Sequence, residues 1–549
     1  MNRGWQVLRV GMLLMTALLG ACSGGTQSHP SGALPDSVIA GRIASAHLRR
    51  HLSSSPATLD PALVQDVMGL SVDSDLFEGL LRQGADGALL PGMAERWEVS
   101  ADALSWKFHL RAAQWSNGDP VTAGDFVFAW RRVVDPATAS PVAQQMAPVA
   151  GALDIAAGRL PPESLGATAI DARTLEVHLE SPTPFFLSLL INSFMMPVHP
   201  ATVQREGRAW TQPGKLVGNG AFLLQSREVN GRIDLIRNPR YWDAAAVRLA
   251  ALTWFPLTDS AASTARFLAG DLDETERFQV EDLDWLRASL GDQVRTAPYN
   301  GTVMLGMNVR RPPFDDARLR RAMVLALDRP LLTDQLLKGL YEPAYGIVPP
   351  LPGYVPPRPE WADLDTDARH ELARRLYAEA GYSRAKPLEV ELSVPLGSPE
   401  MRRVFEALTA MWRMNLGAEV RVITEEFRVH QQNRRIGKLP FFWNAWIGDY
   451  PEPTTYLALA LNSNPQNYMR FDDPQYERLM AEAMRQTGEA ERHRLYREAE
   501  SLLDREAPFL PIYFYKSRHL LRSYVQGWQD NANDLHPSRD LYLAPKPER

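Results

Sequence analysis

Apolar and polar side chains alternate along residues 106–111, WKFHLR, with the period of two that is typical of a half-buried strand. The period then changes to that of a helix, which Thr122 and Asp125 open with a pattern similar to a capping box. The apolar face of this helix would carry Phe126, Val127, Trp130 and Val133. The dipeptide DP at residues 135–136 is expected to end it. This stretch therefore predicts a strand followed by a helix.

Short strands and helices alternate through the rest of the chain. The same two periods predict strands at residues 174–182 and 388–396, and helices at residues 315–337 and 368–382. Such alternation is typical of a mixed α/β fold. The chain has 549 residues, 45% of them hydrophobic, which is enough for a large core and too long for one ordinary domain. We therefore expect an α/β protein with two or more lobes.

The N-terminus has the layout of a secretory signal. Two arginines precede an apolar run at residues 10–20, which is too short for a stable membrane span of ~20 apolar residues. Cys22 is the one cysteine of the sequence, and it ends the segment LGAC, which resembles the lipobox of bacterial lipoproteins. We predict a signal peptide at residues 1–21, lipidation of Cys22 and a lipid tether over residues 22–44. The alternative is a small cysteine within an ordinary signal peptide.

Charge and motifs exclude several classes of function. Lys and Arg number 59, Asp and Glu number 65, and no long block of like charge indicates a nucleic-acid partner. The sequence contains no Walker P-loop and no G-x-S-x-G elbow, and the single cysteine in the lipobox leaves no thiol nucleophile. The pair His370-Glu371 lacks the second histidine of a zinc-protease box, and His47 and His51 lack a third ligand nearby. We therefore predict no enzyme activity, no cofactor and no metal site.

Asp449 follows a nearly uncharged run that contains Trp443 and Trp446. Three roles compete for this acid: catalysis, capping of a helix that begins near Pro453, and pairing with a cation that arrives from outside. Catalysis with Glu452 is disfavoured, because acids three residues apart seldom face each other across a substrate at the ~5 to 10 Å that a glycosidase needs. The residues alone leave the cap and the counter-charge open, and they favour packing roles for the tryptophans.

Several separated motifs together resemble one protein family. They lie at residues 59–61, 75–81, 91–111, 115–141, 210–224, 238–242, 307–329 and 449–457. Their order and spacing hold from about residue 45 to the C-terminus. They resemble the extracytoplasmic solute-binding proteins of ABC importers, in the peptide/nickel class whose best-known type is the periplasmic oligopeptide-binding protein.

The resemblance implies a two-lobed α/β periplasmic-binding-protein fold of the Venus-flytrap type with an extra small domain. Carried over by position, lobe I would comprise residues 45–77, 200–300 and 516–549. The extra domain II would comprise residues 78–199, and lobe III residues 301–515. The ligand would lie between lobes I and III, which would close around it by hinge motion.

The resemblance also implies a function in transport rather than catalysis. A monomer, anchored by lipid to the extracytoplasmic side of the membrane, would bind peptides as extended strands through their main chains and deliver them to the permease of an ABC importer. Water in roomy pockets would let many side chains fit, so specificity would be broad. Asp449 matches the aspartate that pairs with the peptide α-ammonium in this family.

Other site residues follow from the same alignment. The segments that would line the peptide contain Val67, Asn219, Gly220, Ala445 and Gly448, with Trp446, Trp443 and Phe427 as pocket walls. For each of these residues, core packing is an equal alternative.

The chain departs from the oligopeptide-binding type at several positions. Val324, Met401 and Trp443 stand where that type offers basic side chains to the peptide carboxylate. Val142 replaces an aromatic residue that contacts the peptide, and Gly301 and Ile447 replace an internal cysteine pair. Another solute, such as a cell-wall peptide, a metal chelate or a sugar, therefore stays open. An exported hydrolase or a chaperone is the alternative from a different class.

Overall fold

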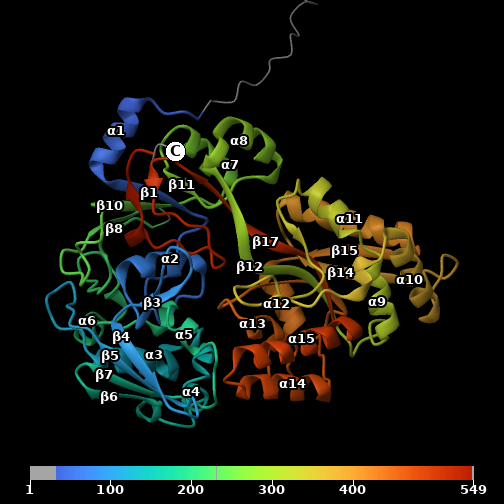
Figure 1. Cartoon of the computed structure of the whole chain (residues 1–549), viewed down its shortest axis with the longest axis horizontal. Helices are drawn as coiled ribbons and strands as arrows, with labels where there is room; N and C mark the ends of the chain where they lie inside the picture. The colour runs from blue at the N-terminus through green and yellow to red at the C-terminus, as the bar shows by residue number, and fades with distance from the viewer. Residues whose placement is uncertain (1–31, 230, 547–549) are drawn as a thin grey trace, which may run out of the picture.

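The computed structural model describes residues 32–229 and 231–546, so the predicted signal peptide and Cys22 lie outside the described residues. Two halves lie side by side, and the long strands β12 (Val294–Met307) and β17 (Phe509–Leu521) run between them (Figure 1). One half contains both ends of the described chain, and the yellow and orange middle of the chain forms the other. The expected two-lobed α/β fold is confirmed. Within the described ranges, no helix combines the length and the apolar character needed to cross a membrane.

The first half is built on a four-stranded sheet with the order β1-β10-β9-β8. Its strands are β1 (His47–Leu52), β8 (Phe222–Arg227), β9 (Ile233–Arg237) and β10 (Ala251–Pro256). β1 pairs with β10 in parallel, and the other pairs are antiparallel. The same half contains α2 (Val67–Leu76), α6 (Pro200–Glu206), α7 (Ser260–Leu268) and α8 (Leu283–Leu290). Two short two-stranded antiparallel sheets complete it. One pairs β2 (Leu81–Gln83) with β3 (Leu89–Pro91), and the other pairs β18 (Val525–Gln526) with β19 (Tyr542–Leu543).

A smaller antiparallel sheet with the order β4-β5-β7-β6 forms a unit below the first half (Figure 1). Its elements are β4 (Ala94–Val99), β5 (Ser105–Leu110), α3 (Ala123–Val134), α4 (Ala152–Ala156), β6 (Ala167–Asp171), β7 (Thr174–His178) and α5 (Phe186–Leu189). The strand and helix predicted from residue 106 onward are confirmed as β5 and α3. The predicted capping box is also present, since the Thr122 backbone N–H donates to the Asp125 carboxylate at 2.9 Å.

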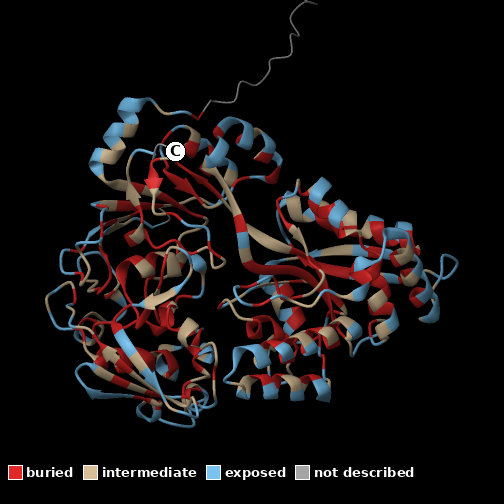
Figure 2. Cartoon of the chain, viewed as in Figure 1, coloured by how far each residue is buried: buried red, intermediate tan, exposed pale blue. Residues whose placement is uncertain are grey.

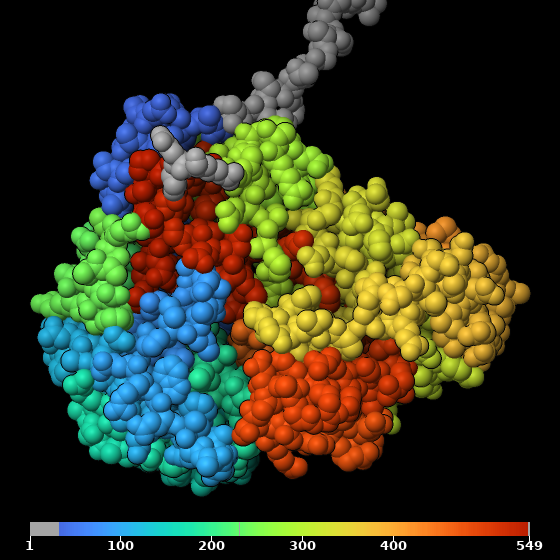
Figure 3. Space-filling model, in the orientation of Figure 1, coloured from blue at the N-terminus to red at the C-terminus, as the bar shows by residue number. Residues whose placement is uncertain are grey.

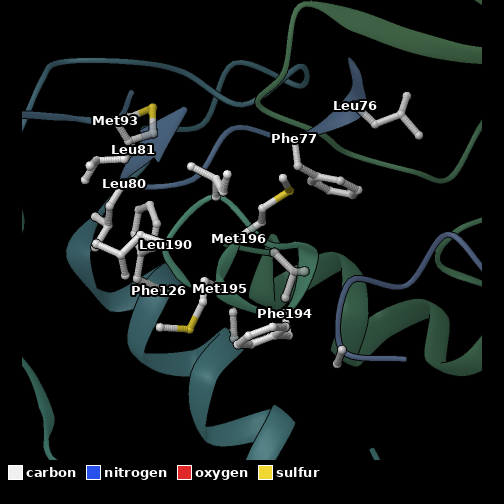
Figure 4. Close-up of a cluster of buried hydrophobic side chains, with 14 of the residues drawn as sticks. Leu76, Phe77, Leu80, Leu81, Met93, Phe126, Leu190, Phe194, Met195 and Met196 are labelled. Atoms are coloured by element: carbon white, nitrogen blue, oxygen red, sulfur yellow. The ribbon is translucent and has the colours of Figure 1, made fainter. Parts of the chain in front are cut away.

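One hydrophobic core joins this smaller sheet to the first half. Figure 4 shows part of it, with side chains from the end of α2, from β2 and from the segment around residue 195 gathered against α3. The labelled members are Leu76, Phe77, Leu80, Leu81, Met93, Phe126, Leu190, Phe194, Met195 and Met196. Burial of each such side chain stabilises the fold by about 1.5 to 3 kcal/mol. The small unit is therefore packed firmly onto the first half.

The second half is built on a seven-stranded sheet with the order β11-β17-β12-β16-β14-β15, to which β13 adds beside β17. Its other strands are β11 (Glu274–Thr275), β13 (Glu342–Pro343), β14 (Glu389–Pro395), β15 (Glu419–Glu425) and β16 (Phe441–Ile447). The helices are α9 (Ala317–Leu325), α10 (Thr366–Glu379), α11 (Pro399–Leu416), α12 (Phe427–Arg435), α13 (Thr454–Leu457), α14 (Pro474–Arg485) and α15 (Glu489–Glu506). α11 is the crossover between the parallel strands β14 and β15.

The helix predicted over residues 315–337 is interrupted. α9 ends at Leu325, and a separate π-helical segment covers Leu331–Leu336. Pro330 lacks a backbone N–H and disfavours the helical conformation of the residue before it, so one continuous helix cannot form. The buried Arg329 side chain instead donates to the Val324 carbonyl at 3.2 Å and to the Pro511 carbonyl at 2.9 Å.

Part of the predicted lipid tether is ordered, which corrects the assignment of residues 22–44. Residues Asp36–Ser45 form helix α1. Ile39 and Ile43 lie one turn apart on it and pack against the core of the first half. Arg42 also donates to the Gly270 carbonyl at 2.6 Å. These tertiary contacts give the segment a partner that its local composition does not reveal.

The strands β12 and β17 contain two of the expected lobe boundaries. The positions 300/301 and 515/516 both fall inside these strands rather than in loops. The register between the two strands shifts between Pro298 and Thr302. Such an irregularity bends and twists a strand pair locally.

A buried ionic network fastens the C-terminal segment to β11 and β17. The ring of His519 contacts Glu274 through Nδ1 at 3.0 Å and Asp534 through Nε2 at 2.8 Å. His536 contacts the same Asp534 oxygen at 3.2 Å, and Arg50 from β1 approaches Glu274 at 3.4 Å. The network joins segments that are far apart in the sequence, and it lies where β11 and β17 meet the first half.

Candidate functional site

Strand β16 brings the Asp449 segment to the place where the two halves meet. In the sheet, Ile447 of β16 is opposite Gly301 of β12, and Gly301 lies in the part of β12 that crosses between the halves. The space-filling view is hollowed beside the crossing strands, between the blue and the yellow surfaces (Figure 3). The residues that follow β16 therefore lie next to this hollow.

One edge of β16 is open to a further strand. β14 pairs with β16 only at Ser393 opposite Phe442 among the residues that the structure describes. Gly448 donates its N–H to the Asn300 carbonyl at 2.7 Å, so strand alternation points the backbone groups of Ala445 and Ile447 away from β12. The edge at residues 445–447 can therefore accept hydrogen bonds from an extended chain and donate to it.

The Trp443 carbonyl points in the same direction but is already satisfied. His430 Nε2 contacts it at 3.1 Å, and Arg434 donates to it at 3.3 Å. The Trp443 ring is half-buried and packs against the core of the second half. The open edge therefore ends before Trp443, which serves as a wall rather than as a hydrogen-bonding partner.

Asp449 lies at the end of this open edge. Its backbone N–H donates to the Thr455 hydroxyl oxygen at 3.1 Å, and Trp446 Nε1 donates to the same oxygen at 3.0 Å. The Thr455 hydroxyl hydrogen is then free to bond the Asp449 carboxylate. One threonine thus orients both the acid and the neighbouring indole.

The Asp449 carboxylate has no cationic partner of its own. No lysine, arginine or histidine in the described part of the chain forms a salt bridge with it. The residue is exposed to solvent, yet nearby protein atoms remove part of the hydration of its carboxyl, and this desolvation raises the pKa to about 6 despite the bond from Thr455. A carboxylate in such surroundings gains most from a cation that comes with a ligand.

The alternative role of Asp449 as a helix cap is wrong. Helix α13 begins at Thr454, and the Thr454 N–H donates to the Glu452 carboxylate at 3.1 Å. Glu452 therefore satisfies the helix N-terminus, and the Asp449 side chain is left for another purpose.

The loop that carries Asp449 is held by Asn300. The Asn300 amide donates to the Gly448 carbonyl at 3.3 Å and to the Tyr450 carbonyl at 3.1 Å, while Tyr456 donates to the amide oxygen at 2.6 Å. A Cβ atom at Gly448 would lie 2.4 Å from the Asn300 amide nitrogen, so only glycine fits there. The loop is thereby tied to the strand that crosses between the halves.

An aromatic stack reaches across to the smaller sheet unit. Phe185, just before α5, and Tyr450, next to Asp449, stack with ring centroids 4.2 Å apart and planes only 4° from parallel. The contact joins the small unit on the first half to the Asp449 loop of the second half. It spans the gap that would open if the halves moved apart.

The other expected site residues separate into two groups. Trp446, Ala445 and Gly448 come together with Asp449 through β16, as described above. Val67 at the start of α2 and Phe427 at the start of α12 belong to opposite halves, and their side chains are 42% and 48% exposed. Their role as walls of the ligand cleft stays a prediction.

Asn219 and Gly220 contact the chain at the end of α2. The Asn219 side chain is buried and uses both polar atoms on the backbone of Glu78, at 2.9 Å each. A Cβ atom at Gly220 would lie 2.4 Å from the Leu76 carbonyl carbon, so the two segments are in direct contact. The Asn219 side chain is thus used within the fold, and the expectation that its segment lines the ligand stays a prediction.

Val324 does not line the hollow. It is buried on α9, inside the core of the second half. The departure from the oligopeptide-binding type at this position stays a prediction.

The sequence interpretation missed Thr455, Tyr450, Phe185 and Asn300. The two threonines after Pro453 are a local signal that could have suggested a hydroxyl near Asp449. Phe185 and Asn300 have no such signal, because their contacts with the loop exist only after folding.

Metal ligands gather at one place in the described residues. Single ligand atoms of His519, Asp534 and His536 all lie within 4.8 Å of one another. Both ring nitrogens of His519 already contact carboxylates, and His536 contacts Asp534. We interpret this group as an ionic network within the fold.

The sequence of the chain is similar to those of known solute-binding proteins. Residues 88–468 match the family described as bacterial extracellular solute-binding proteins, family 5 Middle. The chain is 36% identical to the periplasmic murein peptide-binding protein MppA of Escherichia coli K12, over 90% of this chain and 93% of that one. It is 37% identical to the periplasmic oligopeptide-binding protein OppA of the same strain, over 90% and 92%.

A solved structure of a peptide-binding protein is similar to this chain in its fold. The Haemophilus influenzae OppA complex with RPPGFSPFR aligns with a TM-score of 0.78 and 33% identity, covering 91% of this chain and 99% of that one. The likeness therefore extends over both halves.

Proposed function

The chain belongs to the bacterial extracellular solute-binding proteins of family 5, and from this premise we propose that it captures peptides between its two halves for import by an ABC transporter. The peptide would bind in an extended conformation along the open edge of β16. Its α-ammonium would pair with Asp449. The names of the relatives with known peptide ligands support this class of ligand.

Two neighbouring features carry the proposal. Asp449 has no salt bridge with a described side chain, and the adjacent edge of β16 has no paired strand. The edge at residues 445–447 offers hydrogen bonds that every peptide backbone can use, so it gives affinity without reading side chains. Asp449 adds a charge contact at one end, which selects a free amino terminus. Together they favour a peptide over a solute that lacks either group.

Closure of the halves would complete the site. Bending would occur where β12 and β17 cross between the halves, because the register shift there already interrupts the ladder of hydrogen bonds. The Phe185–Tyr450 stack would then mark the closed state that docks on the permease. A closed cleft also excludes water, which strengthens the contact between Asp449 and an ammonium group.

The test is to identify what the protein carries. Protein purified without refolding is analysed by native mass spectrometry, and released ligands are sequenced. We expect a mixture of peptides with free amino termini. Recovery of one non-peptide solute, or failure of any free-amine peptide to bind the emptied protein in calorimetry, would refute the proposal.

A murein-type peptide is the second candidate. Met401 and Trp443 stand where the oligopeptide-binding type offers basic side chains, so the far carboxylate of an ordinary short peptide lacks those partners. The relative MppA, named for murein peptides, covers nearly the whole chain. The same mass spectra distinguish the two, because γ-linked D-glutamate and diaminopimelate give characteristic fragments.

The stack between the halves predicts a change in release rate. Phe185→Ala removes one ring, and such pairs contribute about 0.5 to 1.5 kcal/mol, so we expect peptide dissociation to become about fivefold faster. Stopped-flow displacement of a fluorescent peptide measures this rate. Phe185→Trp, which keeps an aromatic surface, is the control. An unchanged rate in Phe185→Ala would show that the stack does not hold the closed state.

The lipobox predicts membrane attachment. We propose that Cys22, which lies outside the described residues, carries the lipid and tethers the protein to the extracytoplasmic face of the membrane. Cys22→Ala is expected to shift the protein from the membrane fraction to the soluble fraction, because lipid chains supply the attachment. Fractionation and immunoblotting measure this, with Ser23→Ala as the control. A variant that still sediments with membranes would contradict the anchor.

A further inference from the structure

A second cavity lies within the second half, apart from the Asp449 loop. It has a volume of about 620 Å³ and is enclosed by α9, α15, the start of β17 and the chain between residues 345 and 364. Its apolar walls include Val324, Tyr345, Ile347, Trp361, Leu372 and Phe509. No residue of β16 or of the Asp449 loop lines it. A volume of this size suits a small organic molecule.

A buried acid faces this cavity with one oxygen unused. Glu500 on α15 is 6% exposed and lines the cavity. Its Oε1 accepts the hydrogen bond of the Tyr354 hydroxyl, whereas Oε2 accepts no hydrogen bond from the described part of the chain. A Cβ atom built on Gly346, another lining residue, would lie 3.4 Å from Oε2, so there is space beside this oxygen.

Most of the other charged groups of the cavity have partners of opposite charge. Asp504 lies one turn beyond Glu500, accepts from Trp361 Nε1 at 2.7 Å and interacts with Arg321 and Arg505, which also line the cavity. Arg358 from the 345–364 chain pairs with Asp363 at 2.6 Å and covers the Tyr345 ring. Arg497 lies near enough to Glu500 to lower its pKa, but the two form no salt bridge. Glu360 also lines the cavity but is exposed to solvent, so Glu500 is the buried acid of this cavity that lacks a matched charge.

We propose that this cavity is a second ligand site, which takes a small primary amine with an apolar body. The ammonium group would contact Glu500 Oε2, and the apolar part would lie against Trp361, Tyr345 and Phe509. A buried carboxyl that lacks a cation is costly to ionise, and an ammonium ion of fitting size removes that cost. The site is separate from the peptide cleft and does not rest on the function proposed for it.

Protonation adds a second signature. Burial raises the pKa of Glu500 to about 8, so at pH 6.5 the empty cavity holds a neutral carboxylic acid. Binding of an ammonium ion favours the carboxylate and must release that proton. The released fraction is therefore close to one proton at pH 6.5 and falls as the pH rises through about 8.

Calorimetry with benzylamine tests the proposal, with benzyl alcohol as the uncharged probe of the same shape. We expect saturable binding of one benzylamine per protein, with the proton release above, and at least about tenfold weaker binding of benzyl alcohol. Glu500→Gln should weaken benzylamine binding by at least about tenfold. Glu498→Gln, on the exposed face of the same helix, should leave it unchanged.

Two further variants test the site without depending on the folding of Glu500→Gln. Gly346→Leu places a side chain in the space beside Oε2 while Glu500 stays in place, and it should abolish benzylamine binding even if Glu500→Gln folds poorly. Asp449→Asn should leave benzylamine binding unchanged. The proposal is overturned if benzyl alcohol binds as tightly as benzylamine, if neither cavity variant weakens binding, if Asp449→Asn removes binding, or if no binding is detected.

Discussion

Replacing Asp449 by alanine is expected to weaken the binding of a peptide with a free amino terminus at least thirtyfold, or about 2 kcal/mol. The carboxylate lies beside the open edge of β16, has no salt bridge with a described side chain, and is oriented by Thr455. In the closed cleft, its loss would leave the peptide ammonium desolvated and without a counter-charge.

Isothermal titration calorimetry with one peptide and its N-acetylated form measures this effect. The acetylated peptide lacks the ammonium group, so Asp449→Ala should change its affinity little, and the difference between the two peptides isolates the charge contact. Glu406→Gln, an exposed acid on α11, is the control and should bind as the unaltered protein does. Equal loss for both peptides, or no loss at all, would remove Asp449 from recognition.

The same titrations at several pH values carry a second signature of Asp449. Partial desolvation raises the pKa of the Asp449 carboxyl to about 6 when no ligand is bound, and binding needs the ionised form. Affinity should therefore fall below pH 6, by about tenfold per pH unit, as protons compete with the peptide. It should fall again above about pH 8, where the peptide amino group loses its proton. In Asp449→Ala, the loss of affinity below pH 6 should be absent.

Replacing His519 by glutamine is expected to lower the free energy of unfolding by about 3 kcal/mol at neutral pH, because it breaks a buried ionic contact and leaves carboxylates unpaired. Both ring nitrogens of His519 contact acids, Glu274 at 3.0 Å and Asp534 at 2.8 Å. These acids raise the pKa of His519 to about 10, although burial opposes the shift. The same pairing lowers the pKa of Asp534.

The pH dependence follows from the sign of these shifts. His519 has a raised pKa in the folded state, so its contribution is fully present below its unfolded pKa of about 6.5 and is lost as the pH rises through about 10. Asp534 has a lowered pKa, so its contribution is present above about pH 4 and is lost in acid.

Urea unfolding between pH 6.5 and 9.5 measures the contribution of His519. The unaltered protein should lose stability across this range, and His519→Gln should lose much less. His178→Gln, an exposed histidine on β7, is the control and should behave like the unaltered protein. Parallel curves for all three proteins would show that His519 is not held as a cation.

Local sequence patterns predicted secondary structure correctly where the residues that determine it are close together in the sequence. The alternation at residues 106–111 and the Thr122–Asp125 box predicted β5 and α3, because strand period and capping depend on residues within one turn. The tether assigned to residues 22–44 depended on composition, which did not predict helix α1, because Ile39 and Ile43 pack against a core supplied by distant segments. Local patterns failed at Pro330, where the helical pattern on both sides concealed the interruption.

The sequence by itself determined the family, the order of elements and the presence of an acid at position 449, because motif spacing and side-chain period are properties of the linear chain. It left open whether that acid caps a helix or awaits a cation. Only the tertiary structure decided this, since Glu452 satisfies the helix, Thr455 orients Asp449, and Asn300 and Phe185 arrive from distant segments. The free energy of a charged side chain depends on the groups and solvent around it, and folding brings those groups together from distant parts of the chain.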